Sequence, residues 1–159
     1  MKIKRITQTG VLLLMLGAPV LVFVTLYLFG ENHYDLPYEG RYELKAPGDT
    51  LPLPLPESQL PWLSRGKVHI VRLKATAPSP ATEAQWQRLQ VYFRTNKTVM
   101  LHDIAPDSLH LSYLSPWHDY RQQPFVLVDK QGYVRGHYGS DMEEYDRLIT
   151  ETLIAVKLP

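Results

Sequence analysis

Hydrophobic residues follow three different patterns along this chain of 159 residues, and each predicts a different kind of structure. Residues 11–29 form one apolar run without a charged side chain, which is typical of a membrane helix. Prolines and glycines are frequent in residues 30–61, a composition that favours an extended connector, either a spacer or an edge segment that packs Leu51, Leu53 and Leu55. From residue 62 to residue 159, short apolar stretches alternate with polar turns. This last pattern predicts a folded α/β domain.

The apolar run is long enough to cross a lipid bilayer. At about 1.5 Å per residue, residues 11–29 span about 28 Å, which is close to the hydrocarbon thickness of a membrane. The run ends in bulky residues, unlike a signal peptide that is cleaved at a small-residue site. Three basic residues and no acidic one precede it, so residues 1–10 are expected in the cytoplasm. We therefore expect a single-pass inner-membrane protein that contacts the bilayer through residues 11–29 and has an extracytoplasmic, periplasmic domain.

The domain pattern predicts a β-α-β unit followed by a β-β-α unit. The last helix is expected to start at Ser140, because Ser140 and Glu143 have the spacing of a capping box. This order of elements is that of the thioredoxin fold, so we expect a central sheet flanked by helices. The expected strands are residues 68–75, 98–102, 125–128 and 133–138, the first helix is residues 81–95, and a further apolar run covers residues 109–114.

Two segments of the domain resemble the SCO/SenC family of membrane-anchored, thioredoxin-like proteins. KVHIVRLKATAPSPATEAQWQRL, residues 67–89, is similar to the strand, the redox and copper turn and the helix of this family. Residues 125–148, which contain the pattern VDKxGxxRGxY, are similar to its last strands and helix. The resemblance therefore implies the same fold and an anchored domain.

The positions of the family's copper ligands hold other residues in this chain. In the family, two cysteines of the turn and one later histidine hold copper; Ala77 and Ala81 stand at the cysteine positions. Arg121 stands near the histidine position, and the nearest imidazole, His118, comes three residues earlier. The chain contains no cysteine, which excludes disulfides, thiol–disulfide exchange and thiolate ligation. We therefore expect no inherited copper site, no cofactor and no enzymatic activity.

A binding or assembly role is the function that the resemblance implies, in the maturation of a respiratory oxidase or of a copper site. Its partner would be an oxidase subunit or another maturation factor. The APSPA turn, residues 77–81, is also compatible with an ordinary helix start, since proline is common at the first positions of a helix. Pro124 stands where thioredoxins keep a cis-proline, and its own isomer is left open. The expected partner surface consists of Ala77, Ala81, Trp117, Arg121 and Pro124, a composition that includes residue types common at binding hot spots.

A metal carrier that uses histidines in place of cysteines is the alternative function. The chain has 6 histidines, of which His102, His110 and His118 are the candidate ligands if the fold brings them together. Copper would be the expected ion in this alternative. An enzyme without a thiol has less support, because the chain lacks a GxSxG motif and a glycine-rich phosphate loop.

Charge argues against a nucleic-acid partner. The chain has 17 basic and 16 acidic residues, and three of the basic residues precede the predicted membrane helix. The remaining domain is slightly acidic and has no basic stripe with interleaved aromatic residues, which is the expected footprint of nucleic-acid binding.

Overall fold

The protein has two units, residues 1–35 and residues 36–159. The structure is a computed structural model and describes residues 15–25, 36–46, 49–74, 79–116 and 118–158. In the first unit, residues 15–25 are helical. Among the described residues, no helix combines the length and the apolar character needed to span a bilayer. Residues 11–14 and 26–29 of the predicted membrane helix lie outside the described residues.

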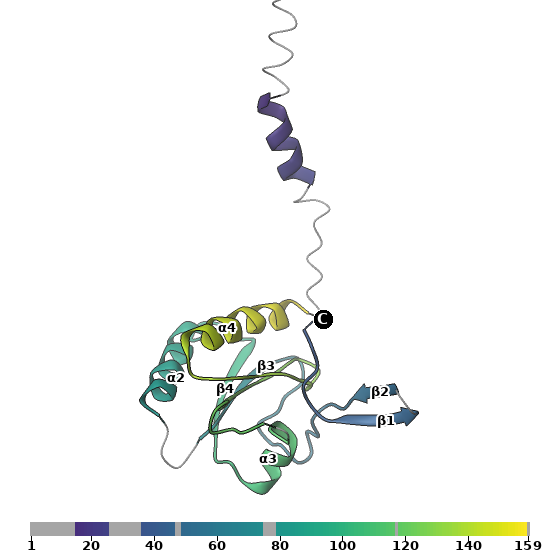
Figure 1. The fold of residues 1–159 in the computed structure, drawn as a ribbon, viewed down its shortest axis with the longest axis vertical. Coiled ribbons are helices and arrows are strands. Elements are labelled where there is room, and N and C mark those ends of the chain that lie inside the picture. The colour runs from purple at the N-terminus through teal and green to yellow at the C-terminus, as the bar shows by residue number, and fades with distance from the viewer. Residues whose placement is uncertain (1–14, 26–35, 47–48, 75–78, 117, 159) are drawn as a thin grey trace, which may run out of the picture. The chain divides into compact units, whose positions relative to one another are not determined.

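The second unit is a mixed α/β domain with a four-stranded sheet and three helices (Figure 1). Its elements, in chain order, are β1 (Tyr42–Ala46), β2 (Asp49–Pro52), β3 (Val68–Leu73), α2 (Pro80–Tyr92), β4 (Val99–Ile104), α3 (Ser108–Leu114), β5 (Phe125–Val128), β6 (Val134–Tyr138) and α4 (Met142–Lys157). The domain strands and both predicted helices are therefore present, with ends that differ by a few residues from those expected. The apolar run at residues 109–114 is an additional helix, α3.

The four-stranded sheet has the order β4-β3-β5-β6. Strand β3 runs parallel to β4 and antiparallel to β5, and β5 runs antiparallel to β6. This order and these directions are compatible with the predicted thioredoxin-like fold. Strands β1 and β2 form a separate antiparallel hairpin.

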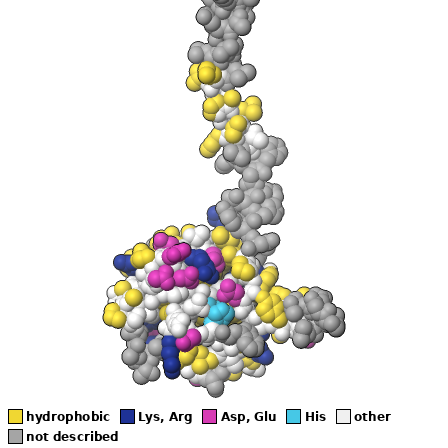
Figure 2. Space-filling view, viewed as in Figure 1, with side chains coloured by type: hydrophobic (Ala, Val, Ile, Leu, Met, Phe, Trp, Pro, Cys, Tyr) yellow, Lys and Arg dark blue, Asp and Glu magenta, His cyan; other side chains and the backbone are white. Residues whose placement is uncertain are grey.

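Helices cover both faces of the sheet (Figure 1). On one face, α2 and α4 pack against the strands through residues such as Leu89, Phe125 and Leu148. On the other face, α3 and the chain before β3 pack through residues such as Leu60 and Leu114. All six residues of β3 are buried. The outer surface of α4, by contrast, carries acidic and basic side chains (Figure 2).

Short polar side chains start the helices. Ser79 caps α2 by accepting a hydrogen bond from the Thr82 N–H at 3.1 Å, with Pro80 in the first turn. Helix α4 starts one residue later than predicted, because the carboxylate of Asp141 accepts from the Glu144 N–H at 2.9 Å. A carboxylate at this position also interacts favourably with the helix dipole. The predicted capping role of Ser140 is therefore wrong.

Most of the proline-rich segment packs with the domain. The compact unit starts at Leu36, whereas the sequence predicts a connector up to residue 61 and a domain from residue 62. Leu36, Leu55 and Leu60 are at most 7% exposed, and the Leu55 N–H donates to the Gly132 carbonyl at 2.8 Å. Prolines prevent helix formation here, and of the leucines in the LPLPLP run Leu55 enters the core while Leu51 and Leu53 remain exposed. The segment therefore belongs to the fold.

The first prediction tests this boundary with the substitution Leu36→Ala. Leu36 is 7% exposed, so removing its side chain should lower the free energy of unfolding by about 2–5 kcal/mol, the usual range for a buried leucine. Leu53→Ala is the control, because Leu53 is 37% exposed and its loss should change stability by about 0.5 kcal/mol or less. Denaturant unfolding measures both. Equal, small effects would show that residue 36 lies outside the folded unit.

Candidate metal centre

His137 lies in β6, at the edge of the sheet, and is the most deeply buried residue of a polar cluster. Its side chain is fully buried, on the sheet face covered by α3. The ring Nε2 lies 2.6 Å from the carbonyl oxygen of Leu114, the last residue of α3. Because a carbonyl oxygen can only accept, Nε2 carries a proton and donates it. This hydrogen bond fixes the orientation of the ring and directs Nδ1 away from α3.

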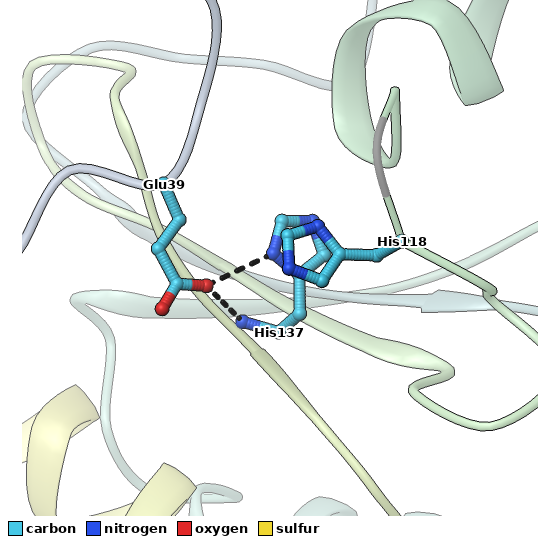
Figure 3. A group of neighbouring side chains, drawn as sticks. All are labelled: Glu39, His118 and His137. Carbon is cyan, nitrogen blue, oxygen red and sulfur yellow. Dashed lines mark hydrogen bonds and ion pairs between the residues drawn. The ribbon is translucent and has the colours of Figure 1, made fainter.

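Glu39 meets His137 on the Nδ1 side (Figure 3). It belongs to residues 36–41, which run along β6 before β1 and which we call the strap. Its Oε2 accepts from the His137 backbone N–H and from Nδ1–H, both at 3.1 Å. The hydrogen bond from the His137 side chain is the main reason that the pKa of Glu39 is lowered. Glu39 is therefore a carboxylate, and one proton lies between it and His137.

His118 completes the cluster from the loop between α3 and β5. Its ring is stacked on that of His137, with centroids 3.9 Å apart and an interplanar angle of 13°. The Ser115 hydroxyl donates to the His118 carbonyl at 2.7 Å and holds this part of the loop. Burial, and then the neighbouring His137, lower the pKa of His118. Its Nδ1 is buried and has no hydrogen-bond partner among the described residues, so a neutral imidazole here has a nitrogen atom to offer a ligand.

Three potential metal ligands thus converge from three separate segments of the chain. Their ligand atoms all lie within 4.8 Å of one another. A tetrahedral Zn²⁺ ion, with bonds of about 2.0–2.1 Å, places its ligand atoms about 3.3 Å apart. Because the His118 and His137 rings are stacked and a nitrogen lone pair lies in the plane of its ring, binding one ion also requires a side-chain rotation that turns both lone pairs towards it. A histidine ligand usually donates its second N–H to a carbonyl, as His137 does to Leu114.

The donor types narrow the choice of ion. Two imidazoles and one carboxylate suit divalent first-row transition metals such as Zn²⁺ and Cu²⁺. Cu⁺ prefers sulfur, which this chain offers only as methionine. Ca²⁺ and Mg²⁺ prefer a shell of oxygen ligands, and the cluster has a single carboxylate. The geometry therefore favours Zn²⁺ or Cu²⁺ with three protein ligands and one open position.

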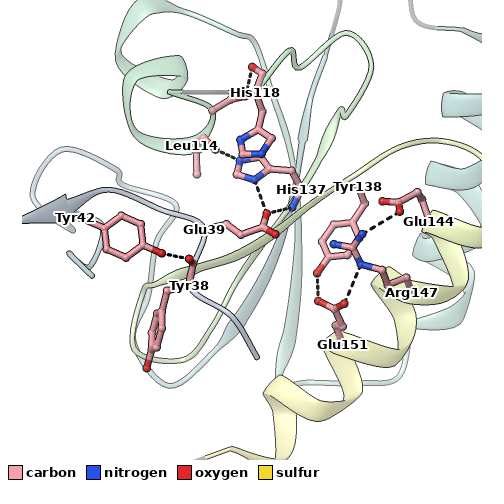
Figure 4. Close-up of polar contacts among 11 residues, drawn as sticks. Tyr38, Glu39, Tyr42, Leu114, His118, His137, Tyr138, Glu144, Arg147 and Glu151 are labelled. Carbon is pink, nitrogen blue, oxygen red and sulfur yellow. Dashed lines mark hydrogen bonds and ion pairs between the residues drawn. The ribbon is translucent and has the colours of Figure 1, made fainter. Parts of the chain in front are cut away.

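Neighbouring charges do not compete for the cluster (Figure 4). Tyr138, the next residue of β6, has its side chain on the opposite face of the sheet, where its hydroxyl donates to Glu151 at 2.6 Å. Arg147 donates to Glu151 at 2.9 Å and to Glu144 at 3.0 Å. Burial, and then the bond to Glu151, raise the pKa of Tyr138. Glu144 and Glu151 of α4 are thus bonded to Arg147 and Tyr138. Glu39 is bonded to His137.

The structure does not bring together the three histidines expected from the sequence. His102 lies against His69, and His110 Nδ1–H donates to Asp107 at 2.7 Å within α3. Only His118 of the predicted set belongs to the cluster. The sequence does not indicate Glu39, because its segment has the composition of a connector. His137 was missed as a ligand, although its place in an alternating strand marks it as inward-facing.

The expected partner surface is described only in part. Ala77 and Trp117 lie outside the described residues. Ala81 is exposed in the first turn of α2, and Arg121 is exposed in the loop before β5. Pro124 is buried, its peptide bond is trans, and its carbonyl accepts from the Leu73 N–H at 2.8 Å. Pro124 therefore lies beside the end of β3, where the chain enters the turn, but it lacks the cis bond of the thioredoxins.

A second pair of histidines lies on the other edge of the sheet. The buried His69 has its Nε2 2.9 Å from the Ser64 carbonyl and its Nδ1 2.9 Å from His102 Nε2. Since Nε2 must donate to the carbonyl, Nδ1 accepts from His102. The Trp62 ring lies 5.1 Å from the His102 ring. Burial lowers the pKa of both imidazoles, and that of His102 to about 4. This pair is thus a neutral, structural contact.

Comparisons with known proteins add little to this description. No family model matches the chain, and no curated protein matches it significantly. Among solved structures, the solution structure of a candidate protein disulfide isomerase from Bacteroides thetaiotaomicron is similar, with a TM-score of 0.44 and 14% identity over 59% of this chain and 76% of that chain. The fold class therefore rests on strand order and direction: a mixed α/β domain, compatible with a thioredoxin-like fold, with a histidine–glutamate cluster against its outer strand.

The second prediction concerns acid stability. A histidine whose pKa is lowered in the folded state stabilises the fold fully above its unfolded pKa, and this contribution is lost as the pH falls. For His102 the loss should occur between pH 6.5 and about 4. His102→Gln should therefore reduce the decline in unfolding free energy over this pH range, as measured by denaturant unfolding at a series of pH values. His110→Gln serves as control and should keep the wild-type profile. An unchanged decline in His102→Gln would contradict the assignment.

Proposed function

We propose that this protein is a non-enzymatic, thioredoxin-like metal-binding protein, in which Glu39, His118 and His137 hold a divalent first-row transition metal. One observation carries the proposal: the buried Nδ1 of His118 has no partner among the described residues, and the His118 ring lies beside a carboxylate and an oriented imidazole. A buried polar atom usually has a hydrogen-bond partner. A metal ion would satisfy this nitrogen and replace the proton between the other two side chains.

Binding, and not redox chemistry, fits the composition of the chain. Without cysteine the domain has no thiolate for disulfide exchange. The copper site implied by the SCO/SenC resemblance also lacks its donors, because Ala77 and Ala81 have no donor atom and Arg121 is a cation. The proposed site therefore uses residues other than those of the family, and its imidazole and carboxylate donors favour Zn²⁺ or Cu²⁺ over Cu⁺.

The proposed setting of this site is the outer face of the inner membrane. The apolar residues 11–29 would anchor the chain, and the basic residues before them would keep the N-terminus in the cytoplasm. The domain would then bind metal in the periplasm as a carrier.

A role in the assembly of a respiratory oxidase or of a copper site is the second candidate function. The hydrogen bond between the Leu73 N–H and the Pro124 carbonyl supports it, because this bond joins the end of the loop that contains Arg121 to the end of β3. An exposed arginine beside an aromatic ring, here Tyr120 at 5.9 Å, is typical of binding hot spots. An oxidase subunit or another maturation factor would dock on this surface.

The third prediction tests metal binding by the full chain in detergent. Titration with Zn²⁺, followed by calorimetry, should show one ion bound per chain, whereas Mg²⁺ should give no heat of binding. Glu39→Gln and His118→Ala each remove one ligand. Because even the loss of a contact that supports a ligand weakens metal affinity about 10–100-fold, each variant should bind at least about 100-fold more weakly.

The control for this titration is His110→Ala. His110 is also a histidine with a carboxylate partner, Asp107, but it lies outside the cluster. This variant should bind Zn²⁺ like the wild type. A flat wild-type titration, or equal losses in the control and the ligand variants, would contradict the proposed site.

The fourth prediction tests the second candidate function. Affinity capture of the full chain from detergent-solubilised membranes should recover an oxidase subunit or a maturation factor, and Arg121→Glu should reduce that recovery by reversing the charge of the exposed loop. Arg94→Glu, at the end of α2, is the control, since Arg94 is also exposed. Recovery of neither kind of protein, or equal recovery with Arg121→Glu, would argue against this surface.

A further inference from the structure

The strap is the one segment of the metal cluster that also leads towards the N-terminal unit. Glu39 comes from the strap, His118 from the loop before β5, and His137 from β6. A metal ion bound to all three would therefore connect the strap to the sheet across about 100 positions of sequence. Such a link acts on the strap much as a crosslink does, because the strap cannot leave β6 without losing a ligand.

Several separate contacts hold the strap in place without metal, in addition to the buried side chain of Leu36 and the hydrogen bonds between Glu39 and His137. The Glu39 N–H donates to the Val134 carbonyl at 3.0 Å, and Arg135 Nη1 donates to the Leu36 carbonyl at 2.8 Å. The guanidinium of Arg135 lies 3.8 Å from the centroid of the Tyr38 ring. Each contact of this kind stabilises the docked strap modestly. The strap is thus docked at an outer strand by contacts that local opening can break.

The fit between the strap and β6 is close. A Cβ atom on Gly40 would lie 3.2 Å from Cβ of Val134, and the ring of Tyr38 meets that of Tyr133 edge-on at 5.2 Å. Glu39 consequently approaches His137 only when the strap is docked, since its backbone binds Val134 and its side chain binds His137 of the same strand. Metal binding and strap docking therefore require the same arrangement.

We propose that metal binding clamps the strap to β6, and this inference rests on the proposed metal site. By reciprocity, a metal that binds only the docked state stabilises docking, and release of the strap weakens metal binding.

Hydrogen exchange of the full chain in detergent, followed by mass spectrometry with and without Zn²⁺, tests the clamp. For a strap that opens only after metal release, the exchange of the Glu39 amide should slow by a factor of 1 + [Zn²⁺]/Kd, about 100-fold when the free ion is at 100 times its Kd. The Phe93 amide at the end of α2, bonded to Leu89, is the internal control and should keep its rate. Mg²⁺ at the same concentration should slow neither amide.

A matched pair of tyrosine variants tests the contacts of the strap. Tyr38→Ala removes the ring next to Arg135 and should speed strap exchange about 10-fold in metal-free protein. Tyr92→Ala is the control, because Tyr92 is also exposed and meets one aromatic neighbour edge-on, Phe93 at 4.9 Å. This control should leave strap exchange unchanged. Tyr38→Phe retains the ring and should restore the wild-type rate.

The possible outcomes separate the clamp from the metal site itself. Slowed strap exchange in Zn²⁺ with an unchanged Phe93 amide supports the clamp. Calorimetric binding of Zn²⁺ without any slowing of the strap overturns the clamp, shows that the ion is held without Glu39, and leaves metal binding in place. Absence of Zn²⁺ binding overturns the proposed function and the clamp together.

Discussion

Burial of the sheet on both faces is the constraint on which the rest of the structure depends. Helices α2 and α4 cover one face, and α3 with the chain before β3 covers the other. A polar side chain on an inner position of these strands therefore loses its water and must find a partner inside the protein. Four such side chains are His69, Arg72, Arg135 and His137.

Three of these four side chains have partners that satisfy them in purely structural ways. Arg72 binds both oxygens of Asp103 and one of Glu83, and its guanidinium lies 4.7 Å from the ring centroid of Trp86. Arg135 binds Asp129 at 2.6 Å, and His69 bonds to Ser64 and His102. The cluster of His137 differs, because it brings two imidazoles and a carboxylate together and leaves the buried Nδ1 of His118 without a partner among the described residues. The buried Nε1 of Trp62, beside His69 and His102, also has no partner there, but an indole N–H can only donate and offers no lone pair to a metal ion. That difference separates a candidate binding site from a structural contact.

The sequence predicts the fold well where local pattern decides the structure. Strand β5 matches its expected limits, and the remaining domain strands and the two expected helices differ only at their ends, because apolar periodicity reports which side chains face the core. Helix α3 was not foreseen, since a short apolar run fits a strand or a helix equally well. The predicted capping residue of α4 lies one position before the observed one, because Ser140 and Asp141 are adjacent and both are good caps.

The site was harder to predict than the fold, because its residues are distant in sequence. Nothing in local spacing indicates that Glu39 lies beside His137; the docking of the strap on β6 decides it. The proline content of residues 30–61 also indicates a connector, whereas Leu36, Leu55 and Leu60 of this segment enter the core. Histidine spacing alone selected His102 and His110, which the sheet and α3 hold elsewhere. Only the tertiary structure shows that Glu39 provides the carboxylate of the cluster.

The most direct test of the metal site is anomalous X-ray diffraction from crystals of the protein grown with Zn²⁺, recorded at the zinc absorption edge. We expect one strong anomalous peak about 2.0–2.2 Å from Glu39, His118 and His137, with the Nε2–H of His137 still bonded to Leu114. An anomalous map without a peak at these three residues, or with its peak only at other side chains, would contradict the account.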